Sequence, residues 1–206
     1  MFRTPPPLGE AARTRCDEMM RLAEDACSEM RMGTDWALNM QLVDALNQEK
    51  NDTVISEVVR VVRKRIQGKS LRASSLALTL AETLVKNCGF PVHKEIGTER
   101  FLQAMAKLAR THSFRTGRDS LKVADQALDL IQSWGEAFLA QRKDLPMFVE
   151  VYSQLRAEGL PFQEQYRADR PPVLAPGKGG LLEQSAFNAL KAEAGSSRGG
   201  GGAGGG

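Results

Sequence analysis

The chain has 206 residues, of which 42% are hydrophobic and 6% are aromatic, and its formal net charge is +3 at pH 7. This length allows one domain of ordinary size with flanking segments, and the hydrophobic fraction is sufficient for a buried core. So small a net charge does not by itself indicate a nucleic-acid-binding protein. We therefore expect no nucleic acid among the partners, and any basic function must come from local clustering.

Two features indicate the compartment. The three cysteines, Cys16, Cys27 and Cys88, are odd in number and lack C-x-x-C spacing, which is typical of free thiols in a reducing compartment. Residues 1–7 lack the apolar core of a signal peptide, and no run of 18 apolar residues could cross a bilayer. The sequence predicts a cytoplasmic protein without a transmembrane segment, so that any membrane association would be peripheral.

Apolar residues recur at helical spacing along most of the chain, interrupted by capping residues, glycines and prolines. The proline-rich residues 1–10 are expected to be disordered. The expected helices cover approximately residues 11–30, 36–46, 54–66, 71–87, 92–96, 101–109, 121–140 and 146–158.

These seven or eight consecutive helices have short connections, and no segment is a credible strand. The segment 71–87 is apolar on nearly all sides, which is typical of a helix in the middle of an all-α domain. Such helices can form a bundle or a coiled stack of hairpins, and the central apolar helix favours the superhelical stack. We place the domain at residues 11–165 and expect residues 166–206, rich in proline and glycine, to be a flexible tail.

The segment 35–46 is the most informative part of the sequence because, as a helix, it carries two apolar surfaces. At about 100° per residue, Leu38, Leu42, Ala45 and Leu46 share one side, and Trp36, Met40 and Val43 cluster on the opposite side. The second surface is either buried against the first helix or kept for a partner. Exposure of Trp36 is favoured by its place in the first turn, and tryptophan is enriched among binding hot spots.

A basic segment runs from Arg60 to Arg72 and contains no acidic residue. It is either a solvated helix face with its following loop or a patch for acidic lipid headgroups, where each basic residue contributes about 1 kcal/mol. No aromatic residues are interleaved, which argues against RNA. The candidate lipid-binding residues are Arg63, Lys64, Arg65, Lys69 and Arg72.

The residues of a catalytic or metal centre are not recognisable in the sequence. His93 and His112 lie near helix ends without a second histidine at i+4 or a nearby cluster of acids and cysteines, so both are expected to be surface histidines. Phosphate-binding glycine loops and the G-x-S-x-G motif are absent. We therefore expect no enzymatic activity, no cofactor and no metal.

Several motifs taken together resemble the VHS domain. They are Asp35-Trp36-Ala37-Leu38-Asn39-Met40, Lys64-Arg65-Ile66, Leu76-Ala77-Leu78-Thr79-Leu80, Val85-Lys86-Asn87-Cys88-Gly89, Leu130-Ile131-Gln132-Ser133-Trp134 and the segment 151–159. They follow one another in the order typical of the family, from about Leu22 to Phe162, and are most similar to the target-of-Myb-like branch of endosomal sorting adaptors. The resemblance implies an all-α, right-handed superhelix of about eight helices.

The resemblance also implies a partner. VHS domains of endosomal sorting proteins bind ubiquitin through a tryptophan at the start of the second helix and an apolar residue four positions later, which are Trp36 and Met40 here. Relatives often have leucine at the second position. Val43 would extend this surface, and Asn39 or Asp44 would supply hydrogen bonds at its rim. The sequence thus predicts a ubiquitin-binding adaptor module in vesicle-mediated transport, peripherally associated with endosomal membranes.

Two alternatives remain open. In the first, the protein is a phosphoinositide-binding peripheral membrane adaptor without significant ubiquitin binding. In the second, it is a polymerase-tail-binding domain of the same superhelical fold, which should need tyrosine and arginine in a phosphopeptide groove. The two tyrosines, Tyr152 and Tyr166, both come late in the chain.

Overall fold

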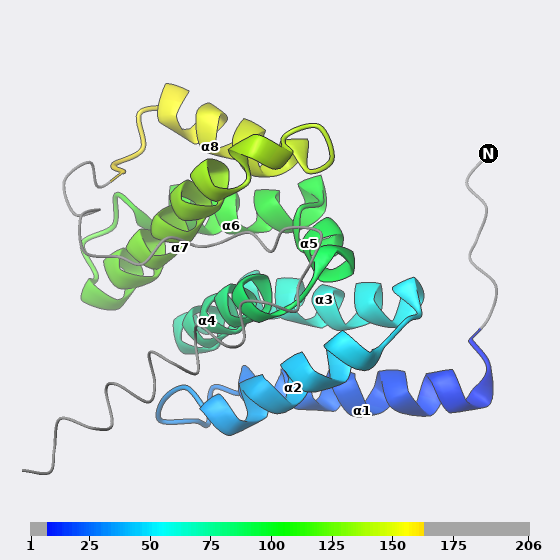
Figure 1. Cartoon of the computed structure of the whole chain (residues 1–206). Helices are drawn as coiled ribbons and strands as arrows, with labels where there is room; N and C mark the ends of the chain where they lie inside the picture. The colour runs from blue at the N-terminus through cyan, green and yellow to red at the C-terminus, as the bar shows by residue number, and fades with distance from the viewer. Residues whose placement is uncertain (1–7, 163–206) are drawn as a thin grey trace, which may run out of the picture. The chain divides into compact units, whose positions relative to one another are not determined.

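The computed structural model describes residues 8–162, and these form a stack of α-helices in which most helices neighbouring in sequence pack side by side, while α3 packs on α1 (Figure 1). The elements are α1 (Glu10–Ala26), α2 (Trp36–Gln48), α3 (Asp52–Ile66), α4 (Leu71–Asn87), α5 (Phe90–Ile96), α6 (Glu99–His112), α7 (Arg118–Ala137), the 3₁₀ turn η1 (Leu139–Gln141) and α8 (Pro146–Ala157). No strand occurs within this range, which confirms the expected all-α superhelix. The predicted disordered N-terminus lies mostly, and the predicted tail entirely, outside the described residues.

Side-chain caps start three of the helices where the sequence places polar residues. Asp35 accepts a hydrogen bond from the backbone N–H of Leu38 (3.1 Å), and Asn51 and Ser70 cap α3 and α4 in the same way. At the C-terminal end of α8, Gly159 has φ +77°, and the N–H of Leu160 donates to the carbonyl of Leu155. This is the Schellman arrangement, which favours glycine because other residues rarely adopt that φ.

The first helix is shorter than predicted. It ends at Ala26, because the next backbone N–H groups bond back to α1 carbonyls in a tight cap and the chain then turns. Met30, expected on this helix, lies in the connection to α2 and is largely exposed. Ala23, Cys27 and Met30 recur at helical spacing, and this spacing led to the prediction of a helix up to residue 30.

The core runs through the whole stack, with α4 at its centre. All but a few side chains of α4 are buried or half-buried, as predicted for a helix that contacts α1, α2, α3, α5 and α7. Cys16, Cys27 and Cys88 are free and buried. Burial raises the pKa of Cys27 and of Cys88 to about 12, so both thiols are protonated and poorly nucleophilic at neutral pH.

His93 is not a surface histidine, contrary to the prediction. It lies in the core on α5, where Nε2–H donates to the carbonyl of Val85 (2.9 Å) and the ring packs edge-on against Phe138. His112 is half-buried, with Nδ1 3.2 Å from the hydroxyl of Ser120. Burial lowers the pKa of His93 below its usual 6.5, and the hydrogen bond to Val85 opposes this shift.

The buried, neutral His93 should make the domain less stable in mild acid. Its pKa is lower in the folded state, so the unfolded state binds more protons and stability falls as the pH drops through about 6.5. We expect His93→Gln, which keeps a neutral donor, to reduce the change in unfolding free energy between about pH 7.5 and about pH 5.5. Urea unfolding at both pH values measures this. An unchanged pH dependence in the variant would assign the effect to other groups, such as His112, whose pKa is also lowered.

Candidate functional site

The candidate protein-binding surface lies at the start of α2, where two apolar side chains one turn apart face outward. Trp36 is 61% exposed and Met40 is 41% exposed. Burial against the first helix is thus excluded for both side chains. The next residue on this side of the helix, Asp44, is also exposed and can accept hydrogen bonds at the rim.

Two residues predicted for this surface lie inside the protein. Val43 is 2% exposed and belongs to the hydrophobic core, and Asn39 is 1% exposed. The buried side of α2 consists of Asn39, Leu42, Val43 and Leu46, which is the usual i, i+3, i+4, i+7 stripe with a polar residue at its first position. Neither Val43 nor Asn39 can contact a partner in this structure, so the candidate surface is limited to Trp36, Met40 and Asp44.

The connection between α1 and α2 is fixed beside this surface by Arg31. The Arg31 guanidinium donates to the carbonyl of Asp25 at the end of α1 (2.6 Å) and to the carboxylate of Asp35, the cap of α2 (2.6 Å). The N–H of Leu38 and the positive charge of Arg31 lower the pKa of Asp35, which is therefore ionised at neutral pH. The side chain that caps α2 is thereby held in place, and with it the first turn that carries Trp36.

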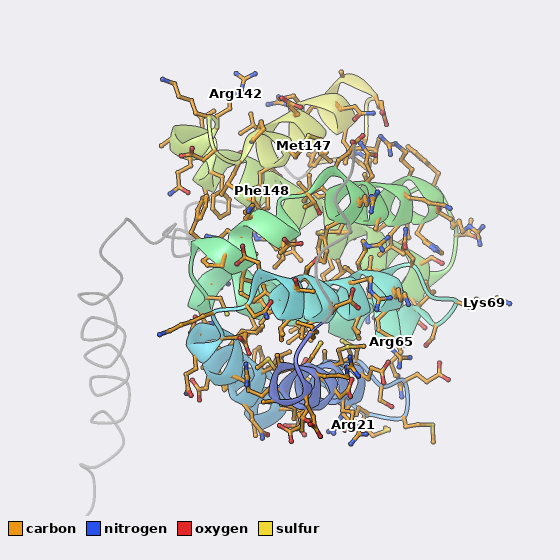
Figure 2. The ribbon with its side chains drawn as sticks, turned by 90° about the vertical axis from the view of Figure 1, so that its right-hand side faces the viewer. Arg21, Arg65, Lys69, Arg142, Met147 and Phe148 are labelled. Atoms are coloured by element: carbon orange, nitrogen blue, oxygen red, sulfur yellow. The ribbon has the colours of Figure 1, made fainter. Side chains whose placement is uncertain are left out.

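The second candidate site is the basic segment at the end of α3. Lys64, Lys69 and Arg72 are exposed, whereas Arg63 and Arg65 are half-buried. Arg60 belongs to the same sequence cluster but forms an ion pair with Glu57. Figure 2 shows Arg65 near the end of α3 and Lys69 extending away from the helices at the edge of the domain. The structure thus brings at least three accessible positive charges together around the α3–α4 connection.

Other features of the described residues do not add to these sites. A groove of about 710 Å³ between α1 and α2 is lined by residues of both charges and by Met19, Leu22 and Ala45, but not by Trp36 or Met40. Within residues 8–162, no group of three or more His, Cys, Asp or Glu side chains is placed to hold a metal ion. No helix in this range is long and apolar enough to cross a membrane.

The described residues thus form an all-α superhelix with a tryptophan exposed at the start of its second helix. Residues 14–159 match the model of the VHS domain, and the chain belongs to this family. The match covers nearly all of the described residues, including both candidate sites and all helices except the first turn of α1.

Curated relatives include Target of Myb1 membrane trafficking protein from Mus musculus, 38% identical over 68% of this chain and 27% of that protein. TOM1-like protein 6 from Arabidopsis thaliana is 33% identical over 74% of this chain and 22% of that protein. The chain thus spans about a quarter of the length of these relatives. The structure of the VHS and FYVE tandem domains of Hrs, a protein involved in membrane trafficking and signal transduction, has the same fold, with a TM-score of 0.60, 23% identity and coverage of 81% of this chain and 67% of that one.

Proposed function

We propose that this domain is a ubiquitin-binding module of a membrane-trafficking adaptor, with Trp36 and Met40 at the centre of the ubiquitin-binding surface. The role in trafficking is supported by the relatives, since the Mus musculus protein is named as a membrane trafficking protein. The choice of partner is supported by the resemblance to ubiquitin-binding VHS domains. The observation on which it depends most is the exposure of Trp36 and Met40 on a helix whose other large apolar residues are buried or half-buried.

The chemistry of the surface suits a weak, reversible complex. The Trp36 indole offers a large, flat apolar area with one N–H donor, and such residues dominate the binding energy of small interfaces. The Met40 side chain is flexible and polarisable, so it can pack against the same partner surface that relatives contact with leucine. Because two apolar side chains bury little area, we expect a dissociation constant of roughly 100 µM or weaker.

Substitution of the two residues tests the proposal. We expect Trp36→Ala to weaken ubiquitin binding by about tenfold or more, and Met40→Ala by severalfold, because a central anchor contributes more than its neighbour. NMR titration of the full chain with ubiquitin measures both effects. Leu139→Ala is the matched control, since Leu139 is similarly exposed but lies in η1. Wild-type affinity in both Trp36→Ala and Met40→Ala would show that ubiquitin does not bind at this surface.

A second candidate function is contact with an anionic phosphoinositide membrane. It is favoured by one observation: the exposed lysines Lys64 and Lys69 and the exposed Arg72 lie around a connection without an acidic residue. Each such residue near an anionic surface contributes about 1 kcal/mol. This contact is compatible with ubiquitin binding, and an adaptor that carries both would recognise ubiquitinated cargo on an endosomal membrane.

A further inference from the structure

Three connections lie along one edge of the domain. Arg72 of α4 donates to the carbonyl of Arg31, which places the α3–α4 connection beside the α1–α2 connection. Ser75, one turn further along α4, bonds Gln126 of α7 (2.7 Å), and Gln126 also bonds Thr79. These bonds join the first half of α4 to the middle of α7. Figures 1 and 2 agree in showing the α1–α2 and α6–α7 connections at this edge, and Figure 2 shows Lys69 there.

This edge carries apolar side chains that have no packing role. Phe114, in the α6–α7 connection, is 76% exposed, and Met30 and Met32 in the α1–α2 connection are exposed even more. The α6–α7 connection forms a hydrogen-bonded turn. The backbone N–H of Arg115 donates to the carbonyl of His112, and the hydroxyl of Ser113 donates to the carbonyl of Ala109. Phe114 is thus held outside the core by a hydrogen-bonded turn.

Positive charge gathers around Phe114 and at the neighbouring α3–α4 connection. Arg115, Arg118 and Lys122 flank Phe114 and are exposed, and Lys64, Lys69 and Arg72 lie at the neighbouring connection. Residues 110–118 and 60–72 contain no acidic residue, whereas Asp119 follows the α6–α7 connection and the exposed acids Glu24, Asp25 and Glu29 precede Met30. An exposed aromatic residue among basic ones matches the interface of an anionic bilayer, where the ring enters the boundary of the acyl chains and the cations contact headgroups.

We infer that the domain docks on anionic membranes through this edge, with Phe114 inserted into the lipid interface and Arg115 and Arg118 against the headgroups. The inference rests on the second candidate function and extends it, because it adds an insertion site that the α3–α4 basic segment lacks. It also sets an orientation, with the ends of α1, α3 and α6 toward the membrane.

The test is co-sedimentation of the full chain with vesicles of phosphatidylcholine, with and without phosphatidylserine. We expect binding only to the vesicles with phosphatidylserine, and binding weaker by roughly tenfold or more in Arg115→Glu/Arg118→Glu and severalfold weaker in Phe114→Ser. Phe90→Ser and Lys94→Glu/Lys143→Glu are matched controls, since Phe90 is 51% exposed and lies in α5, and these lysines are also exposed. The controls should bind as the wild type does.

A spectroscopic measurement separates insertion from simple charge attraction. Phe114→Trp in a Trp36→Phe background should shift its emission to the blue on adding vesicles with phosphatidylserine, because the indole leaves water. Phe90→Trp in the same background should show no shift. The other tryptophan, Trp134, is buried and gives a constant background.

The variants distinguish the ways in which the membrane proposal could be wrong. If Lys64→Glu/Lys69→Glu abolishes vesicle binding while the Phe114 and Arg115/Arg118 variants bind normally, the basic segment acts alone and the insertion is overturned. If the wild type does not bind the vesicles at all, both the candidate membrane contact and the inference fail, and the ubiquitin proposal is unaffected. If Phe114→Ser weakens ubiquitin binding rather than vesicle binding, the edge belongs to a protein interface and the inference is wrong.

Discussion

Truncation of Phe148 to alanine should lower the free energy of unfolding by about 3–5 kcal/mol, the range for a large aromatic residue removed from a core. Phe148 is fully buried at the start of α8, stacked on Phe138, the residue after α7, with the ring centroids 4.3 Å apart. The rings of Trp134 and Phe148 form a T-shaped pair with their centroids 5.8 Å apart. The substitution therefore leaves a cavity between α7 and α8 and removes contacts from two aromatic neighbours.

Urea denaturation of Phe148→Ala, Phe148→Leu and the control Phe90→Ala measures this effect. Phe148→Leu should cost less than Phe148→Ala because most of the volume remains. Phe90→Ala should change stability by no more than about 1 kcal/mol because Phe90 is half exposed. A cost below about 1 kcal/mol for Phe148→Ala would contradict the packing of α8 on α7.

Substitution of Gly135 by alanine should destabilise the domain by about 2 kcal/mol, although alanine is the better helix former. A Cβ at Gly135 would lie 2.7 Å from the Cβ of Tyr152 and 2.8 Å from its Cδ1. The Cβ of Tyr152 is attached directly to the backbone of α8, so the contact is relieved only if α8 moves. The cost of overpacking, about 1–3 kcal/mol or more, then exceeds the gain of about 1 kcal/mol in helix propensity.

Gly33→Ala is the control for the Gly135 substitution, since no atom lies within 4 Å of its added Cβ. Thermal and urea unfolding should show little change for Gly33→Ala. In a Tyr152→Gly background, Gly135→Ala should cost less or become stabilising, because the clashing atoms are gone. Equal costs in both backgrounds would show that Tyr152 is not the obstacle.

The sequence predicted the fold well where periodicity and stop signals agree. The bounds of α4 were predicted from an apolar run and the following Gly89, and the structure has the helix at the predicted residues. The end of α8 is similarly marked by Gly159. The end of α1 was missed because it depends on hydrogen bonds from Cys27 and Arg31, which periodicity does not reveal.

The candidate site could be predicted only in part. The second apolar surface of the helix identified Trp36 and Met40 as candidates but left open whether they are buried, and Val43 was assigned to this surface because it lies on the same side at about 100° per residue. Asn39 instead starts the buried stripe, and its side-chain Nδ2 has no hydrogen-bond partner in the described part of the chain. A polar residue at a core position cannot be identified from one sequence, and the same is true of the buried His93.

The edge with Phe114 was missed for a different reason. Its members come from three connections far apart in sequence, and only the stacking of α1, α4 and α7 brings these connections together. Residues 110–118 show only a local excess of basic residues in the sequence, with Phe114 at their centre. An aromatic residue in the centre of a basic, glycine-containing connection was the available signal.

The most direct test of the proposed function is a map of amide chemical-shift changes on titrating the isotope-labelled wild-type chain with ubiquitin. We expect the largest changes to fall on residues 35–44, including the indole N–H of Trp36, and the amides of α6 and α8 to stay unchanged. Changes centred on any other part of the domain, with the Trp36 indole unaffected, would contradict the proposed function.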